Sequence, residues 1–206
     1  MIGLINSKIS NLGSVQRWLK ALNLDFKLIE IPDDFVDIDL LIFPGVGSFD
    51  TVANYLSISG LGKSIINYII SGKKYVGICL GFQVLFESSE EGKELGLGFF
   101  KEKISKLNRD YPVRLPHVGF NDIQTEEPNL IMREFNNKSF YFTHSFGLLA
   151  FSPPSDTKLA YTKYGKLIFI SCVENKNILA FQFHPEKSSS LGITLLKRII
   201  EWSKKG

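Results

Sequence analysis

The sequence contains a cysteine in a setting that favours nucleophilic chemistry. Cys79 ends the apolar run Tyr75–Ile78, and the segment that follows it, Gly81–Glu87, has a helical pattern. Glycines lie two residues before and two residues after the cysteine. This spacing is typical of a nucleophile elbow, a strained strand-to-helix turn with no room for side chains at the flanking positions. The turn places the thiol at a helix N-terminus, where free N–H groups favour the thiolate. The alternative interpretation is an inert, buried cysteine.

A cysteine nucleophile needs a base, and His184 is the histidine that the pattern favours for this role. It follows the apolar run Ala180–Phe183, and Glu186 comes two residues later. If the chain stays extended through Pro185, both side chains point to the same side. The carboxylate could then hold one imidazole nitrogen while the other nitrogen faces the thiol, as in a catalytic triad. The alternative is a loop histidine beside a solvated glutamate.

A glycine-rich loop supplies the third element of such a site. Pro44-Gly45-Val46-Gly47-Ser48 directly follows the apolar run Leu40–Phe43. Attack of a thiolate on a carbonyl places negative charge on oxygen, and preorganised backbone N–H groups stabilise that charge. The N–H of Leu80 is one natural donor, and that of Val46 or Gly47 could be the second. Because glycine pairs are also common in ordinary turns, this motif is weak by itself.

The other two histidines and the second cysteine have ordinary structural interpretations. Cys172 lies in an apolar strand and is expected in the core, while His117 looks like a loop residue. His144 stands at a strand end, where it could be structural or line a pocket. No Cys or His cluster has the spacing of metal ligands, so we predict no metal.

Composition and charge exclude several classes of protein. With 206 residues, 44% of them hydrophobic, the chain suits one globular domain, predicted to span residues 1–206. A net charge of +3 gives no electrostatic support to nucleic-acid binding. No apolar run approaches the roughly 20 residues of a membrane-spanning helix, and we expect no signal peptide. Two cysteines do not make a disulfide framework, so we expect a cytoplasmic protein.

The order of the predicted elements indicates an α/β fold with a mostly parallel central sheet flanked by helices. The expected strands of the first half are 1–5, 26–31, 40–43 and 75–78, and the expected helices are one capped by Asn11, 50–56 and 62–70. The second half predicts a smaller antiparallel or mixed addition, followed by a last helix over 189–203. Its strand-like pieces are 101–107, 113, 118–123, 140–143, 159–164, 168–173 and 178–183, the last two joined by a hairpin turn over 174–177.

These motifs resemble class I glutamine amidotransferases. The likeness rests on the elbow 77–83, the loop 44–47 and Phe183-His184-Pro185-Glu186, and it extends from Met1 to the last helix. Three further stretches, 115–121, 141–146 and 182–188, are similar to one group in that family, the glutaminase subunits of imidazole glycerol phosphate synthases. The resemblance implies a flavodoxin-like fold and no cofactor.

The resemblance also implies roles for individual residues. Cys79 would attack the side-chain amide of L-glutamine, giving a glutamyl thioester and ammonia, and His184, oriented by Glu186, would move the proton. Leu80 and Val46 would supply the oxyanion N–H groups, Val46 after a backbone flip that Gly45 and Gly47 permit. The resemblance assigns the binding of glutamine to Gly47, Gln83, Ser145 and Phe146. It places Tyr141 and Lys187 at the contact with a (β/α)8 synthase (cyclase) subunit. The implied heterodimer makes imidazole glycerol phosphate for histidine biosynthesis.

Some positions depart from the usual pattern of this group and keep alternatives open. The departures are Ser48, Phe82 in place of Met, Phe120 in place of Trp, Phe146, and Ala180 in place of Gly. None belongs to the triad. A paralogous subunit that feeds ammonia to a sugar amidotransferase of surface-polysaccharide synthesis would carry the same triad. A free-standing cysteine hydrolase and a non-catalytic binding subunit are the other two alternatives.

Overall fold

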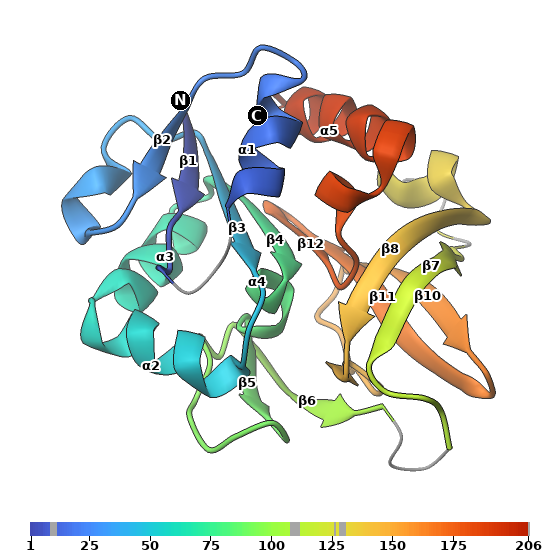
Figure 1. Cartoon of the computed structure of the whole chain (residues 1–206). Helices are drawn as coiled ribbons and strands as arrows, with labels where there is room; N and C mark the ends of the chain where they lie inside the picture. The colour runs from blue at the N-terminus through green and yellow to red at the C-terminus, as the bar shows by residue number, and fades with distance from the viewer. Residues whose placement is uncertain (9–11, 108–111, 126, 128–130, 206) are drawn as a thin grey trace.

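A seven-stranded sheet forms the centre of the computed structural model, which describes residues 1–8, 12–107, 112–125, 127 and 131–205 (Figure 1). In spatial order its strands are β10 (Lys158–Tyr164), β11 (Leu167–Asn175), β12 (Ile178–Phe181), β4 (Lys74–Cys79), β3 (Leu40–Gly45), β1 (Ile2–Ile5) and β2 (Phe26–Ile29). The strands from β12 to β2 run parallel, whereas β10, β11 and β12 pair antiparallel. The predicted hairpin between β11 and β12 is confirmed.

Helices cover both faces of this sheet, as the alternation of strands and helices predicted (Figure 1). On one face lie α1 (Gly13–Lys20) and α5 (Ser189–Ser203), and on the other lie α2 (Phe49–Ile58) and α3 (Leu61–Ile70). The predicted cap Asn11 lies outside the described residues. None of the helices in the described ranges is long and apolar enough to cross a membrane.

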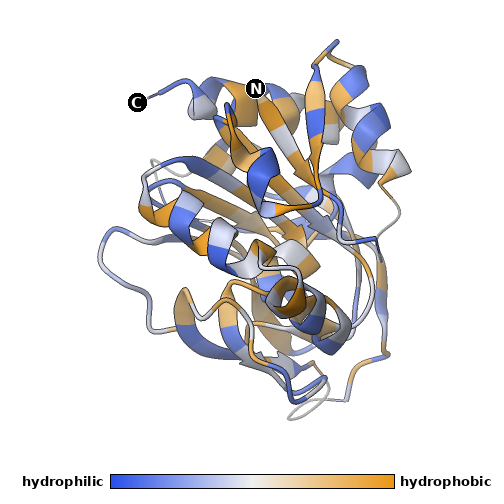
Figure 2. Cartoon of the chain, turned by 90° about the vertical axis from the view of Figure 1, so that its left-hand side faces the viewer, coloured by the Kyte–Doolittle hydropathy of each residue, from blue (hydrophilic) through white to orange (hydrophobic). Residues whose placement is uncertain are grey.

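Two hydrophobic cores form because successive side chains of a strand point to opposite faces of the sheet. In β3, Leu40 and Ile42 pack in the core under α1 and α5, whereas Leu41 and Phe43 pack in the core under α2 and α3. All four side chains are buried. Figure 2 accordingly shows hydrophobic residues concentrated in the strands and both kinds of residue in the helices. This explains why the parallel strands read as unbroken apolar runs in the sequence.

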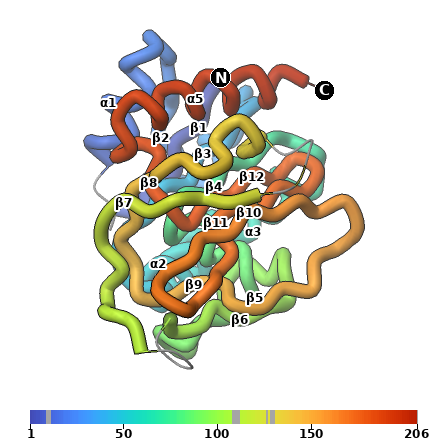
Figure 3. The backbone as a smooth tube through the Cα atoms, turned by 90° about the vertical axis from the view of Figure 1, so that its right-hand side faces the viewer, coloured from blue at the N-terminus to red at the C-terminus, as the bar shows by residue number. Residues whose placement is uncertain are grey.

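Two smaller sheets form the predicted antiparallel or mixed addition, but three of the pieces assigned to it, 159–164, 168–173 and 178–183, instead join the central sheet as β10, β11 and β12. One is a mixed sheet of β5 (Phe86–Ser89), β6 (Phe100–Lys106) and β9 (Phe146–Gly147), and the other is an antiparallel pair of β7 (His117–Ile123) and β8 (Lys138–His144). The pair β7–β8 lies beside the β10 edge of the main sheet (Figure 3), where a bridge joins Gln124 to Tyr161. Three short 3₁₀ helices, η1 (Pro32–Phe35), η2 (Ile131–Phe135) and η3 (Pro185–Lys187), complete the elements.

The helix predicted after the cysteine was wrong in length. The helix α4 is a single turn, Leu80–Gln83, and the chain then enters strand β5. Aromatic packing accounts for the early end, because the ring of Phe86 lies 5.2 Å from that of Phe82 and 5.3 Å from that of Phe100, which is its partner in the register of β5 and β6. A longer helix would carry Phe86 away from this cluster.

Smaller differences concern the ends of elements. The strand predicted to reach Ile31 ends at Ile29, since Pro32 begins η1, and the strand predicted to reach Phe183 ends at Phe181. The strand predicted at Val113 is absent, and that residue lies in an irregular segment.

Candidate active site

Cys79 lies at the end of β4, in the middle of the sheet and immediately before α4. Its backbone has φ 53° and ψ −100°, a strained conformation for a residue with a side chain. A Cβ atom at Gly77 would lie 2.5 Å from the carbonyl oxygen of Gly81, and one at Gly81 would overlap the carbonyl oxygen of Phe43. The predicted reason for the two flanking glycines is therefore confirmed.

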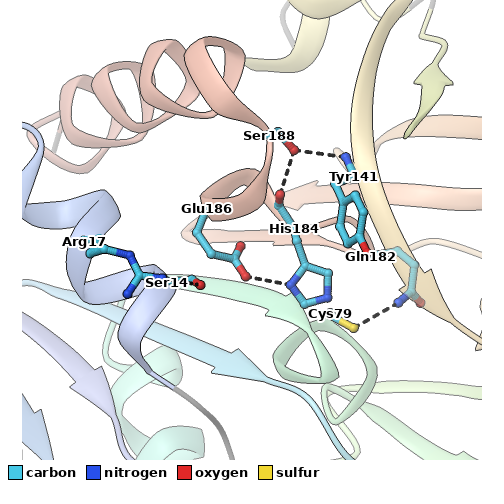
Figure 4. Close-up of polar contacts among 8 residues, drawn as sticks. All are labelled: Ser14, Arg17, Cys79, Tyr141, Gln182, His184, Glu186 and Ser188. Atoms are coloured by element: carbon cyan, nitrogen blue, oxygen red, sulfur yellow. Dashed lines mark hydrogen bonds and ion pairs between the residues drawn. The ribbon is translucent and has the colours of Figure 1, made fainter. Parts of the chain in front are cut away.

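The structure brings His184 and Glu186 together beside Cys79 (Figure 4). His184 Nδ1 and Glu186 Oε1 are 2.7 Å apart, and their side chains are only 1% and 4% exposed. His184 Nε2 is buried, makes no regular hydrogen bond with a described residue, and belongs to the part of the ring that lies next to the Cys79 sulfur in Figure 4. The thiol is also nearly buried, with 6% of the residue exposed.

The backbone reaches this arrangement by a route that the sequence did not predict. The segment through Pro185 is not extended but forms η3, in which the N–H of Lys187 donates to the carbonyl of His184 at 3.1 Å. Pro185 fits the first position of a helical turn because its φ is fixed and it lacks an N–H. The turn nevertheless returns the carboxylate to the imidazole, because the side chain of Glu186 is long enough to reach back.

The electrostatics of the site favour a charged imidazole. Burial lowers the pKa of His184, but the negative sulfur of Cys79 and the hydrogen bond and charge of Glu186 outweigh it and raise the pKa to about 10. The raised pKa favours the protonated form of the His184 imidazole at neutral pH. A thiolate–imidazolium pair is the reactive form of a cysteine nucleophile.

Ser188, which the sequence reasoning missed, ties the histidine to strand β8. Its hydroxyl donates to the carbonyl of His184 at 2.7 Å and accepts from the N–H of Tyr141 at 3.0 Å (Figure 4). The N–H of His184 in turn donates to the carbonyl of Tyr141 at 2.8 Å. The backbone of Tyr141, whose side chain is half-buried, therefore holds the backbone of His184 in place.

The glycine-rich loop lies beside the elbow. Gly45 is the register partner of Cys79, and a Cβ atom there would lie 2.6 Å from that of Leu80. Val46 lines a cavity of about 90 Å³ together with His184 and Glu186. Gly47 follows with φ 126°, a conformation that favours glycine. Both residues predicted to stabilise an oxyanion are thus next to the reactive groups.

Three of the four residues predicted to hold glutamine come together on the other side of the elbow. Gln83 Nε2 donates to the carbonyl of Phe146 at 2.8 Å, and the carbonyl of the neighbouring Ser145 accepts from the N–H of Leu107 at 3.0 Å. The fourth, Gly47, is in the loop after β3.

A buried histidine pair supports this wall of the site, and it corrects the prediction that His117 lies in a loop. His117 is in β7, and its Nδ1 lies 3.3 Å from Nε2 of His144, whose Nδ1 donates to the carbonyl of Phe146 at 2.8 Å. The His117 ring also stacks on Tyr164, with ring centres 4.1 Å apart. Burial lowers the pKa of His117 to about 4. Burial also lowers the pKa of His144 to about 3, because it outweighs the hydrogen bond to the Phe146 carbonyl, which raises that pKa.

We expect this pair to make the protein sensitive to acid. Both histidines stay neutral in the folded state at pH values where the histidines of the unfolded chain, with pKa values near 6.5, bind protons. The contribution of this pair to the free energy of unfolding is therefore fully present above about pH 6.5 and decreases as the pH falls towards 4. His184, protonated in both states below about pH 6, adds no slope there. Urea unfolding at pH 7 and 4.5 should show the loss, and His117→Phe should reduce it; an equal loss in both proteins would contradict the assignment.

The predicted partner residues lie on the surface next to His184. Lys187 Nζ is 5.7 Å from the centre of the Tyr141 ring, and the ring of Phe120 is 5.6 Å from it on the neighbouring strand. Phe120 is 60% exposed and Val118 56%. Tyr141, Lys187, Phe120 and Val118 are called the aromatic surface below.

Two further residues at the site were missed. Gln182, on the path from β12 to His184, places its Nε2 3.7 Å from the Cys79 sulfur. Glu91 accepts the N–H of Phe49, just after the glycine loop, at 2.7 Å, and burial raises its pKa.

The fold and this site define a class: an α/β protein with a cysteine–histidine–glutamate centre at the end of a parallel strand. The family model described as class I glutamine amidotransferase matches residues 3–201. The chain therefore belongs to the class I glutamine amidotransferases.

Individual relatives agree with this assignment. The chain is 41% identical over 204 residues to the imidazole glycerol phosphate synthase subunit HisH of Prochlorococcus marinus MED4, with 97% of each chain covered. It is 33% identical to imidazole glycerol phosphate synthase hisHF of Arabidopsis thaliana, with 97% of this chain but 34% of that longer protein covered. A solved structure of a glutamine amidotransferase superposes with a TM-score of 0.72 at 17% identity, covering 98% of both chains, which supports the fold.

Proposed function

We propose that the chain is the glutaminase subunit of an imidazole glycerol phosphate synthase and delivers ammonia to a synthase subunit in histidine biosynthesis. The observation that carries the proposal is the close grouping of Cys79, His184 and Glu186 in a class I amidotransferase fold. The names of the full-length relatives support the pathway. No observation favours a sugar amidotransferase or a free-standing hydrolase.

The chemistry follows from the charges of the site. The Cys79 thiolate attacks the side-chain amide carbon of glutamine, and the imidazolium of His184 gives its proton to the departing nitrogen, which leaves as ammonia. A glutamyl thioester remains on the sulfur. His184 then takes a proton from water, which attacks the thioester and releases glutamate and the thiolate. Glutamine and water thus become glutamate and ammonia.

The surroundings supply binding and charge stabilisation. Backbone N–H groups of Leu80 and Val46 stabilise the oxyanion, the latter after reorientation of the loop between Gly45 and Gly47. Gly47, Gln83, Ser145 and Phe146 hold the glutamine. Its α-ammonium group needs a negative partner, which Glu91 beside the loop can provide.

The aromatic surface is the proposed contact with a separate (β/α)8 synthase subunit. Aromatic side chains such as Phe120 and Tyr141 are of the kind enriched at interface centres, and Lys187 would lie at the polar rim. Because Tyr141 is hydrogen-bonded to the backbone of His184, contact there reaches the catalytic histidine directly. This chain covers only 34% of the Arabidopsis synthase. The rest of that longer protein is available for a second activity, which in the proposed heterodimer would belong to the separate synthase subunit.

The test is glutamine hydrolysis with and without the synthase subunit. We expect slow glutamate release by the chain alone and roughly a tenfold or greater increase when the cyclase barrel and its nucleotide ligand are added. Tyr141→Ala should lower the stimulation by the synthase subunit more strongly than it lowers the rate of glutamate release by the chain alone. Full activity without the barrel would favour a free-standing hydrolase, and stimulation only by a sugar synthetase would favour the polysaccharide alternative.

A further inference from the structure

Gln182 is buried next to Cys79 and has no role in the reaction proposed above. It follows strand β12, and its N–H donates to the carbonyl of Ser171 at 3.0 Å, which keeps the backbone in line with the sheet. Gln182 and His184 both reach the elbow, because the Gln182 carboxamide contacts the Cys79 sulfur and the His184 ring lies next to it (Figure 4). The side chain of Gln182 is completely buried.

Its carboxamide contacts two groups of the site. Nε2 lies 3.7 Å from the sulfur of Cys79, within reach for a hydrogen bond to sulfur, and Figure 4 shows it approaching the sulfur from the side away from Glu186. Oε1 accepts from Nε2 of Gln83 at 3.0 Å.

The orientation of the amide follows from its neighbours. The carbonyl of Phe146 can only accept, so the group of Gln83 that lies 2.8 Å from it must be the NH₂. The second hydrogen of that NH₂ then requires an acceptor, which is the oxygen of Gln182. The NH₂ of Gln182 consequently points at the sulfur. A chain of fixed donors and acceptors thus ends on the nucleophile.

Few charges face the sulfur from the surrounding elements. The imidazolium of His184, backed by Glu186, is the cation on the η3 side, and His144 in β8 is neutral because burial lowers its pKa to about 3. In α4 and at the end of β3, the described residues around the elbow, 80–83 and 43–45, carry no titratable side chain. A dipole from Gln182 therefore acts in a buried region with little competing charge.

We propose that Gln182 is a catalytic residue that donates a hydrogen bond to the Cys79 thiolate, with Gln83 setting the direction of the amide. The inference rests on the proposed function for its role in turnover. The hydrogen bond stabilises the thiolate before attack and again when the thiolate leaves the thioester during hydrolysis. No atom is transferred to or from Gln182.

The experiment measures the alkylation rate of Cys79 by iodoacetamide as a function of pH. A Cys172→Ala background leaves Cys79 as the only thiol. Gln182→Leu removes the donor and Gln182→Glu replaces it with an anion of the same shape. We expect the midpoint of the rate profile to move upward by about one pH unit in the first and further in the second, since a hydrogen bond to a charged group has this magnitude.

Gln83→Met tests the orienting role, because Gln182 can then turn its oxygen to the sulfur and the midpoint should again rise. It also keeps the test open if a Gln182 variant does not fold, as judged by circular dichroism. Midpoints equal to that of the background protein, in folded variants at either position, would overturn the inference.

Glutamine and the synthase play no part in the alkylation, so the two proposals can fail separately. Unchanged midpoints in a protein that hydrolyses glutamine would refute only the role of Gln182. Shifted midpoints in a protein that never hydrolyses glutamine would refute only the proposed function.

Discussion

Cys79→Ala should abolish glutamine hydrolysis, with a loss of about 10⁵-fold or more in kcat. Alanine cannot form the thioester, and the chain has only one other cysteine. That residue, Cys172, is completely buried in β11, and burial raises its pKa well above the ordinary value, so it cannot substitute. The measurement is glutamate release in the presence of the synthase subunit.

Cys172→Ala is the matched control for this result. It removes a thiol of the same kind from the core without touching the site, so activity should stay close to that of the natural chain. Substantial glutamine hydrolysis by the Cys79→Ala protein would rule out the thioester mechanism. Loss of activity in the control alone would point to a different nucleophile.

Glu186→Gln should lower kcat by about 10³-fold to 10⁴-fold, as expected for loss of the carboxylate that orients a catalytic histidine. The carboxylate accepts from Nδ1 of His184 at 2.7 Å and contributes to the raised pKa of that imidazole. An amide could present its NH₂ to Nδ1, which would stabilise the tautomer with its proton on the wrong nitrogen. The imidazolium would also lose a neighbouring negative charge.

The control is Glu134→Gln, which removes a carboxylate from a half-exposed ion pair with Arg198, and neither residue of this pair is assigned to the site. Surface ion pairs of this kind contribute about 1 kcal/mol or less, so activity should be unchanged. Initial rates and pH profiles of both variants check the prediction. A Glu186→Gln enzyme within tenfold of the natural rate would show that His184 does not depend on this carboxylate.

The central sheet and the groups at its carboxyl edge could be predicted because their signals are local. Apolar runs separated by helical segments indicate parallel strands, and the glycines around Cys79 mark a turn whose steric reason the structure confirms. The contact between His184 and Glu186 was also predicted, although it forms through the 3₁₀ turn η3 and not through the extended chain that the prediction assumed. The predicted elements differed mainly at their ends.

Contacts set by tertiary packing could not be predicted in this way. His117 was expected in a loop, but it meets His144 only because β7 and β8 pair in a register that aligns the two residues. The helix after Cys79 ends early because Phe86 joins an aromatic cluster with a strand far along the chain. Gln182 lies two residues before His184 in the sequence, but its contact with the Cys79 sulfur depends on the packing of β12 beside β4.

The most direct measurement labels the protein with 6-diazo-5-oxo-L-norleucine, a glutamine analogue that alkylates an active-site nucleophile. After incubation with the synthase subunit and digestion, mass spectrometry of the peptides locates the label. The account predicts one label per chain, on Cys79, suppressed by excess glutamine. A label on Cys172 or another residue, or an unlabelled chain in a complex that hydrolyses glutamine, would contradict it.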